Sequence, residues 1–165
     1  MIRRCTDLSA ILSVINDAAD AYRGVVPDDC LTEPYMSASH LRDDIASGVE
    51  FWGSEHEGDL VGVMGIQDKG EVSLIRHAYV RTASRNHGIG SSLLTHLRGL
   101  ATTPMLVGTW ADAGWAVRFY EKHGFRLVTT EEKDRLLARH WSIPNRQIET
   151  SVVLGDPAWF SEDRD

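Results

Sequence analysis

A strand, a glycine-containing loop and a helix follow one another between residues 71 and 101, and this unit constrains the fold more than any other feature. The run Glu71–Val80 has few strongly polar residues in its second half, which indicates a central strand covered on both faces. The helix predicted at Ile89–Ala101 carries leucines along one side, at positions 93, 94, 97 and 100. The chain is therefore expected to build a sheet with helices packed against it.

The loop between strand and helix reads Arg85-Asn86-His87-Gly88-Ile89-Gly90. Glycines allow backbone N–H groups to approach a ligand closely. The helix start adds unpaired N–H donors and the positive end of the helix dipole, and Arg85 adds a fixed positive charge. The loop predicts a phosphate or pyrophosphate site, with a plain glycine turn as the alternative.

Two common phosphate motifs do not fit this loop. A P-loop needs a lysine and then a serine or threonine after its second glycine, whereas Ser91-Ser92 follow Gly90. A dinucleotide-binding loop needs a third glycine at position 93, which is Leu93.

The remaining elements complete a single α/β (α+β) domain over residues 1–165, with a mixed, mainly antiparallel sheet and helices on both faces. Leu41 and Ile45 are expected to point inward from the second helix. The predicted elements, apart from the unit above, are strands at Ile2–Thr6, Val49–His56, Leu60–Gln67, Met105–Trp110, Phe125–Thr129 and Ile148–Leu154, and helices at Leu8–Tyr22, Ser37–Ser47, Gly114–His123 and Glu131–Arg139.

Charge and composition exclude several classes of partner. The chain has 17 Lys and Arg against 24 Asp and Glu, a net charge of −7, which argues against nucleic acid and anionic membrane surfaces. Its apolar stretches are shorter than the ~20 residues of a membrane span, and no signal peptide is visible. Cys5 and Cys30 form no CxxC pattern, and the 7 histidines form no metal-binding motif. A cytoplasmic protein without a metal is expected.

Two motifs resemble one known family. Arg85, Gly88 and Gly90 match its acetyl-CoA signature, Q/R-x-x-G-x-G/A. About 30 residues further on, Ala116–Phe125 resembles its A-x-x-F/L-Y-E-K-x-G-F helix end. The chain is identified on these motifs as a member of the GCN5-related N-acetyltransferase (GNAT) superfamily, and the order of elements over residues 2–154 is similar to that fold.

The resemblance implies acetyl-CoA as co-substrate, bound between central strands that splay apart. It implies that the strand at Met105–Trp110 diverges from Glu71–Val80, and that Tyr120 is the general acid. Ala113 stands where many relatives have an asparagine that contacts the cofactor, with Asp112 beside it. The residues implied to contact the pantetheine arm are Ala78, Tyr79 and Val80, with the Val80 N–H near the thioester carbonyl, and those implied to wrap the pyrophosphate are Arg85, Asn86, His87, Gly88, Ile89, Gly90 and Ser91.

The reaction also needs a general base. An alkylamine has a pKa near ~10.4 and must lose a proton before it attacks. His77, three residues before Val80 in the central strand, can titrate near neutrality, but a structural core histidine is the alternative. Glu71 is interpreted as a solvated strand end, and His87 as part of the pyrophosphate loop or as a side chain that points to solvent.

Other residues are candidates for the acceptor side. Trp110 and Trp115 are placed to wall an acceptor pocket or to pack at the core rim, and Trp141 to cover the site. The acidic pairs Asp28-Asp29 and Asp43-Asp44 are placed to attract a cationic acceptor, although solvated surface charge is the default interpretation.

The leading hypothesis is an acetyl-CoA-dependent N-acetyltransferase acting by direct attack of a primary amine, on a small molecule or on a protein or peptide. No GxSxG elbow is present, and neither cysteine lies in a catalytic motif, which agrees with direct attack. A non-catalytic CoA-binding or regulatory module and a transferase for longer acyl groups are the alternatives. The sequence leaves open which amine is the acceptor and whether the chain forms a homodimer.

Overall fold

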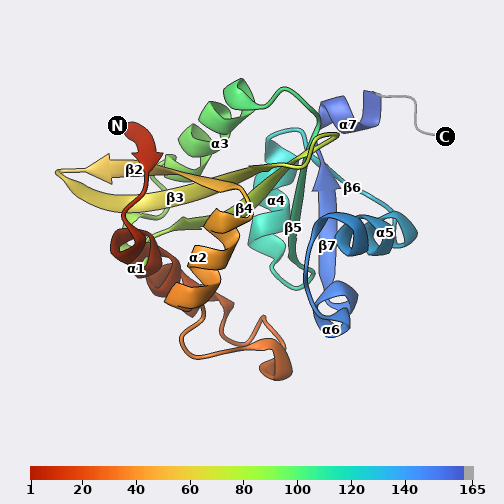
Figure 1. Ribbon diagram of the computed structural model, residues 1–165, viewed down its shortest axis with the longest axis horizontal. Coiled ribbons are helices and arrows are strands. Elements are labelled where there is room, and N and C mark those ends of the chain that lie inside the picture. Colours follow the sequence, from red (N-terminus) through yellow and green to blue (C-terminus); the bar gives the residue numbers. More distant parts are fainter. Residues whose placement is uncertain (162–165) are drawn as a thin grey trace.

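The strands form one seven-stranded sheet in the order β1-β2-β3-β4-β5-β7-β6 (Figure 1). The computed structural model describes residues 1–161. Neighbouring strands are antiparallel except β4 and β5, which run parallel, so the predicted mixed, mainly antiparallel sheet is confirmed. The strands are β1 (Ile2–Cys5), β2 (Val49–His56), β3 (Asp59–Asp68), β4 (Ser73–Val80), β5 (Met105–Trp110), β6 (Arg126–Leu127) and β7 (Ser151–Gly155).

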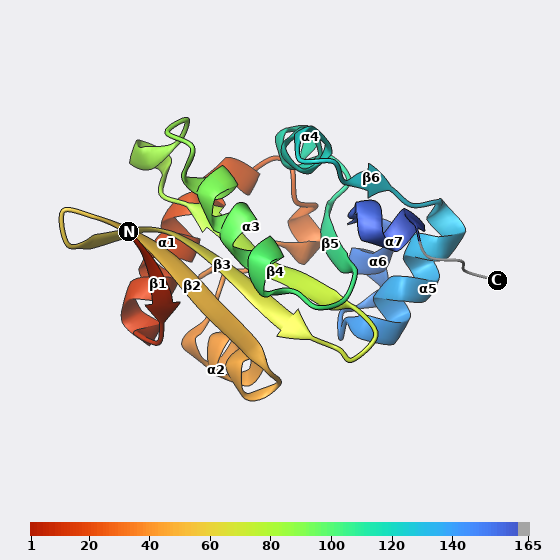
Figure 2. The same cartoon turned by 90° about the horizontal axis from the view of Figure 1, so that it is seen from above.

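Helices cover both faces of this sheet, as predicted (Figure 2). Residues of α1 and α2 form one core cluster with β2 and β3, and residues of α3 and α4 form another on the opposite face. The helices are α1 (Leu8–Ala18), α2 (Ala38–Ala46), α3 (Ile89–Leu100), α4 (Gly114–Lys122), α5 (Thr130–His140), α6 (Asn145–Glu149) and α7 (Pro157–Ser161), with short 3-10 helices η1 (Ala19–Tyr22), η2 (Asp28–Cys30) and η3 (Thr82–Ser84).

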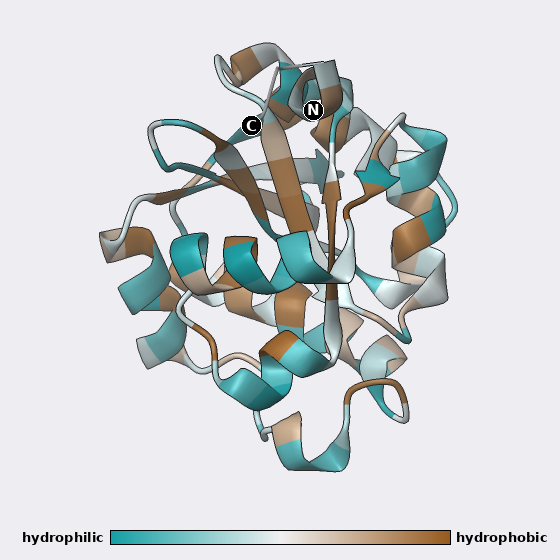
Figure 3. Cartoon of the chain, turned by 90° about the vertical axis from the view of Figure 1, so that its right-hand side faces the viewer, coloured by the Kyte–Doolittle hydropathy of each residue, from teal (hydrophilic) through white to brown (hydrophobic). Residues whose placement is uncertain are grey.

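The period of two along the strands separates the layers. In β5, Met105 and Val107 join the cluster under α3, whereas Leu106 between them joins the cluster under α5. Figure 3 shows hydrophobic residues on the central strands and hydrophilic residues mostly on the surrounding helices. Alternate side chains of β5 therefore pack into two core clusters, one on each face of the sheet.

Side-chain caps fix several helix starts where the sequence predicts them. The carboxylate of Asp7 accepts a hydrogen bond from the Ala10 amide at 3.1 Å and caps α1. Ser37 and Thr129 cap α2 and α5 in the same way. At the end of α2, Gly48 has a φ of +111°, a conformation that glycine adopts without strain.

The prediction that Ile45 points inward is wrong. Leu41 of α2 is fully buried, but Ile45 is 38% exposed. Asp44, which also shares the side of the helix on which Leu41 lies, faces the sheet instead and contacts His77 of β4. Leu100, the last residue of α3, is likewise 43% exposed.

The C-terminal part of the fold differs from the prediction in its details. Asn145–Glu149 form α6, so the last strand begins at Ser151 rather than at Ile148. The helix starts directly after Pro144, whose fixed φ suits a helix N-terminus. Strand β6 is only two residues long, and α7 was not predicted.

We expect Gly65→Ala to lower the free energy of unfolding by about 1–3 kcal/mol. A Cβ on Gly65 would lie 2.8 Å from the Arg76 carbonyl oxygen and 2.8 Å from Cγ1 of Val49, and the carbonyl belongs to a paired strand. Urea unfolding measures the change. Gly99→Ala is the matched control, because no heavy atom outside its own helical turn lies within 4 Å of that Cβ. Equal stability of the two variants would contradict this packing.

Candidate active site

The central strands β4 and β5 part along their length. Only three residue pairs join them: Ser73 with Met105, Leu74 with Leu106, and Ile75 with Val107. The pairing then stops, although β4 continues to Val80. Strand β5 meanwhile stays paired with β7 as far as Trp110. The two ribbons diverge in Figure 1, so the predicted splay is confirmed.

A β-bulge in β4 lies just beyond the splay point. His77 has a φ of +56°, and the β3–β4 register shifts between Val63 and Gly65 opposite it. The extra residue breaks the alternation of side chains, so that Arg76 and His77 both face Asp44 of α2. The bulge thus places two consecutive side chains on one face.

Beyond the bulge, backbone groups of β4 face the open side of the splay. The Arg81 amide donates to the Val61 carbonyl at 2.8 Å, and Tyr79 opposes Val63. Because backbone groups alternate along a strand, Tyr79 bonds β3, while the N–H groups of Ala78 and Val80 point away from it. Of the three residues predicted to pair with the pantetheine arm, Ala78 and Val80 therefore present free backbone edges and Tyr79 does not.

The loop before α3 presents a row of unused amides. None of the backbone N–H groups from Asn86 to Ser91 donates a hydrogen bond within residues 1–161, and the first bond of the helix runs from the Ser92 amide to the Gly88 carbonyl at 3.0 Å. Asn86 and Gly88 have φ values of +65° and +76°, and no side chain caps α3. Such a cradle at a helix N-terminus suits an anion.

Positive charge surrounds this cradle although the chain is acidic. Arg85 forms no ion pair within the described residues. Ser91 Oγ lies 3.0 Å from Nε2 of His123, a contact that the sequence did not indicate. Burial lowers the pKa of His123, and the charges of Arg98 and Lys122 lower it further. The local field therefore favours an anionic ligand.

Tyr120 is buried on α4 between two aromatic rings. Its ring centroid lies 5.0 Å from that of Phe119 and 5.6 Å from that of Phe125, and the residue is 4% exposed. Burial raises the pKa of Tyr120 well above its ordinary value, and the neighbouring Tyr22 adds to the rise. Its hydroxyl makes no hydrogen bond within residues 1–161 and stays protonated at neutral pH.

An aromatic cluster closes the space between the ends of β4 and β5; it consists of Tyr22, Tyr35, Tyr79, Trp110 and Trp115. The Tyr35 hydroxyl accepts hydrogen bonds from the Tyr79 hydroxyl and from Nε1 of Trp110, each at 3.3 Å. The Tyr22 ring lies 5.2 Å from Trp115 and 6.0 Å from Tyr79. All 4 tyrosines of the chain, Tyr120 included, thus gather around the splay.

Comparison with known proteins shows which family has this arrangement of strand, loop and helix. Residues 47–127, which include β4, the loop before α3 and the whole of α4, match the sequence profile described as the acetyltransferase (GNAT) domain. The chain belongs to the GNAT superfamily. No curated protein sequence matches it significantly.

Solved GNAT structures share the whole fold at low sequence identity. The PaiA N-acetyltransferase of Thermoplasma acidophilum, solved with coenzyme A, is 15% identical with a TM-score of 0.72, covering 94% of this chain and 97% of that one. The ribosomal-protein-S18-alanine N-acetyltransferase of Escherichia coli is 16% identical with a TM-score of 0.67, covering 100% and 96%. A GNAT acetyltransferase of Staphylococcus aureus is 17% identical with a TM-score of 0.70, covering 94% and 97%.

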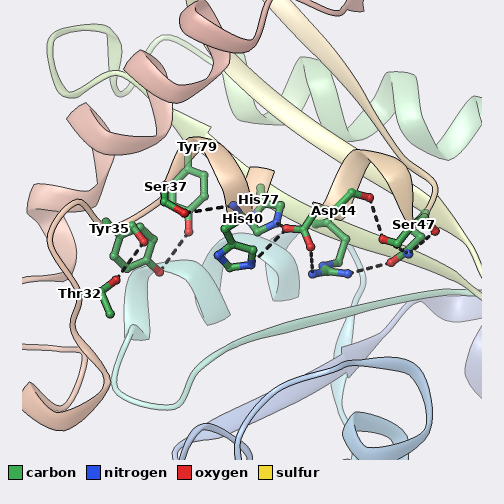
Figure 4. A network of polar contacts seen from close by, with 10 residues as sticks. Thr32, Tyr35, Ser37, His40, Asp44, Ser47, His77 and Tyr79 are labelled. Atoms are coloured by element: carbon green, nitrogen blue, oxygen red, sulfur yellow. Dashed lines mark hydrogen bonds and ion pairs between the residues drawn. The ribbon is translucent and has the colours of Figure 1, made fainter. Parts of the chain in front are cut away.

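His77 belongs to a polar network that joins β4 to α2 of this GNAT fold (Figure 4). Its Nε2 lies 2.6 Å from Oδ2 of Asp44, which also has Nε2 of His40 at 3.5 Å. Oδ1 of Asp44 faces Nη2 of Arg76 at 3.7 Å, and Arg76 donates to Gln67 at 2.8 Å. The default interpretation of Asp44 as solvated surface charge is wrong, since its side chain is only 13% exposed.

The ionisation of this pair follows from its surroundings. Burial lowers the pKa of His77 below its ordinary value, and the hydrogen bond that its imidazole donates to Asp44 opposes this by raising it. Burial alone would raise the pKa of Asp44, but the hydrogen bond with His77 and the charge of Arg76 lower it. A neutral imidazole beside an ionised carboxylate is therefore the state at neutral pH.

The remaining predicted residues lie away from the splay or on its rim. Glu71 precedes β4 and pairs with Arg139, at the end of the strand opposite to Val80. Trp141, predicted to cover the site, instead packs in the core cluster of α5 and β7. Asp29 pairs with Arg146 of α6 at 2.9 Å, which links η2 to the C-terminal half. Asp112 is exposed in the turn after β5, and Ala113 is buried.

Two further features bear on cofactors and membranes. Residues 1–161 contain no group of three or more His, Cys, Asp or Glu side chains that could hold a metal ion. No helix in the same range is long and apolar enough to cross a membrane.

Proposed function

We propose that this GNAT protein is an acetyl-CoA-dependent N-acetyltransferase that moves an acetyl group to a primary amine by direct attack. The observation that carries the proposal is that two sets of backbone groups are free of hydrogen bonds to the rest of the described chain. One set is the amides of Asn86–Ser91, and the other is the open edge of β4 at Ala78 and Val80. They suit a ligand with a diphosphate at one end and an amide-bearing arm at the other. Coenzyme A has both.

The residues divide between binding and orientation. Asn86–Ser91 would hold the pyrophosphate through backbone N–H groups, with the Arg85 guanidinium beside it. The edge of β4 at Ala78 and Val80 would hold the pantetheine arm as an added strand. Bound acetyl-CoA supplies the thioester that is attacked and the thiolate that leaves.

The chain's own groups then manage charge and protons. In this proposal the N–H of Val80 faces the carbonyl oxygen, where negative charge grows during attack. His77 accepts the proton of the acceptor ammonium. Tyr120 donates a hydrogen bond to the departing sulfur. A thiol has a pKa near ~8.5, well below that of a phenol, so full proton transfer from Tyr120 needs the proton that the amine returns.

The acceptor is proposed to enter from the side of the aromatic cluster. Tyr79 and His77 are the side chains that β4 presents there beyond the splay point, next to Tyr35 and Trp110. The acceptor is proposed to be the amine of a small molecule or of a protein or peptide. Nucleic acid and membrane are left out as partners, because a net charge of −7 opposes both. The free thiols Cys5 and Cys30 fit a reducing, cytoplasmic location.

Thermal unfolding in the presence of nucleotides tests the choice of co-substrate. Acetyl-CoA at ~100 times its Kd should add about 2.7 kcal/mol to the free energy of unfolding, because the unfolded chain cannot assemble the loop. ATP and NAD at the same concentration are the controls. Stabilisation by NAD but not by acetyl-CoA would reject the proposal.

Turnover separates an enzyme from a binding module. The expected result is acetyl-CoA-dependent thiol release with at least one member of an amine panel, and a product heavier than that amine by one acetyl group in mass spectrometry. Binding of acetyl-CoA without acetylation of any amine, peptide amines included, would instead favour the CoA-binding or regulatory module. If the kcat/KM for thiol release were higher with longer acyl-CoA donors than with acetyl-CoA, the protein would instead be a transferase for longer acyl groups.

A further inference from the structure

The Asp44 carboxylate lies beside His77, the proposed base, but has no part of its own in the proposed reaction. The bulge in β4 turns Arg76 and His77 to the same face, and Asp44 sits between them. The His77 ring is held on both sides: Phe51 stacks on it at 6.0 Å between centroids, and His40 meets it edge-on at 6.2 Å. The imidazole is therefore fixed in one orientation.

We propose that Asp44 is a positioning residue that holds His77 as the Nε2–H tautomer, so that Nδ1 of His77 takes the proton of the acceptor ammonium. The inference rests on the proposed function, because it assigns the tautomer and the accepting atom of the base proposed for that reaction.

The tautomer follows from what the neighbours can accept and donate. An ionised carboxylate only accepts hydrogen bonds, so at 2.6 Å from Oδ2 of Asp44 the Nε2 atom must carry the hydrogen. Arg76, which only donates, faces the other oxygen of Asp44 and keeps the carboxylate ionised. Nδ1 keeps the lone pair and has no partner within residues 1–161.

The position of Nδ1 fits a base for this site. β4–β5 pairing ends at Ile75, and the bulge residue His77 is the next side chain but one, with Tyr79 following on the same face. Figure 4 shows His77 between Asp44 on one side and Tyr79 with Tyr35 on the other. An amine that approaches the open edge of β4 from the aromatic cluster passes the imidazole, directly or across one water.

The proton and electron pairs balance in this step. The ammonium N–H bond breaks, its electron pair stays on nitrogen, and the proton binds Nδ1 of His77, giving an imidazolium that Asp44 stabilises. The free amine forms the C–N bond to the acetyl carbon as the C–S bond breaks and its electron pair leaves on sulfur. The second proton lost by nitrogen passes to the sulfur through Tyr120, and His77 releases its proton to water.

The charged groups around His77 set the pH dependence. Asp44 and His40 face it from α2, and Arg76 faces it from β4. Burial, Arg76 and His40 lower the pKa of His77, whereas Asp44 raises it. Since the neutral imidazole is the active form, kcat should fall on the acid side as His77 becomes protonated.

Asp44→Asn tests the proposal because the amide reverses the hydrogen bond. Arg76 only donates, so the amide oxygen turns toward Arg76 and the NH₂ group faces Nε2 of His77. Because Nε2 must then accept this hydrogen bond, the imidazole carries its proton on Nδ1. Nδ1 then has no free lone pair with which to take a proton from the acceptor ammonium. Asp43→Asn is the matched control, since it makes the same change at the exposed neighbouring position.

Two measurements decide the outcome. Imidazole ¹⁵N NMR of the unliganded wild type should show His77 protonated at Nε2 and bare at Nδ1, with the reverse in Asp44→Asn. In steady-state kinetics, Asp44→Asn should lower kcat about 100-fold or more with an acceptor KM within a few-fold, while Asp43→Asn should match the wild type.

The possible failures can be told apart. An Nδ1–H tautomer in the wild type, which needs no variant to be folded, overturns the inference. Unchanged kcat in a folded Asp44→Asn overturns it too, with the proposed function intact. A wild type that acetylates no amine removes the proposed function and the inference with it, whatever the tautomer.

Discussion

Tyr120→Phe should lower kcat about 100-fold and leave the Kd of acetyl-CoA unchanged. General acid catalysis typically contributes 10²–10⁴-fold, and the low end is expected because water can partly supply the proton to a thiolate. The substitution keeps the ring that packs against Phe119 and Phe125 and removes only a hydroxyl that has no hydrogen-bond partner among residues 1–161. Steady-state kinetics with an identified acceptor, beside calorimetry with acetyl-CoA, measures both quantities.

Tyr35→Phe is the matched control for this experiment. Its hydroxyl joins Tyr79 and Trp110, so its loss should raise the acceptor KM more than it lowers kcat. If Tyr120→Phe retains full kcat, Tyr120 is a packing residue only. Because burial raises the pKa of Tyr120, its ionisation should cause no loss of activity below pH 10.

Gly88→Val should raise the Kd of CoA roughly tenfold. Gly88 caps α3 at a φ of +76° and a ψ of +10°, a left-handed conformation that costs other residues about 1–2 kcal/mol. The variant loop relaxes to another conformation, and binding must restore the original one, which costs about the 1.4 kcal/mol of a tenfold change. Calorimetry measures the Kd.

Two further substitutions sharpen this result. Gly99→Val, in the last turn of the same helix with open space around its Cβ, should bind CoA like the wild type. Gly90 is less informative, because its Cβ would point at the Phe119 ring at 3.4 Å and would disturb α4 as well. Undiminished affinity in a folded Gly88→Val would place the anion elsewhere.

Local signals in the sequence predicted most of the fold. The bounds of β2 and β5 agree to the residue, and the starts of α3 and α4 agree as well, because period, caps and glycines act within a few residues. The two family motifs also located the loop before α3 and Tyr120 on a helix. All of these features depend on neighbours in the chain.

The polar network and the aromatic cluster depend on contacts across the chain, which no local pattern contains. Asp44 and His77 are 33 residues apart, and Tyr35 and Trp110 are 75 apart. Asp43 and Asp44 are the same residue type, and only the phase of α2 separates the exposed one from the paired one. An inward Leu41 places residues 44 and 45 on its side of the helix alike, so the helix period left both as candidates, and the contact of Asp44 with His77 decides between them.

The short parallel seam at Ser73–Ile75 also has a mechanical consequence. Three residue pairs carry all the backbone pairing between strands β1–β4 and strands β5–β7, so the sheet consists of two half-sheets joined by a narrow hinge. Two ion pairs of exposed side chains add charged ties across this seam: Asp29 of η2 with Arg146 of α6, and Glu71 before β4 with Arg139 of α5. We expect a molecule lying along the free edge of β4 to fill the space beyond this seam and to bridge the two half-sheets. Amide hydrogen exchange at Ser73–Ile75 should then be slower with the bound molecule than without it.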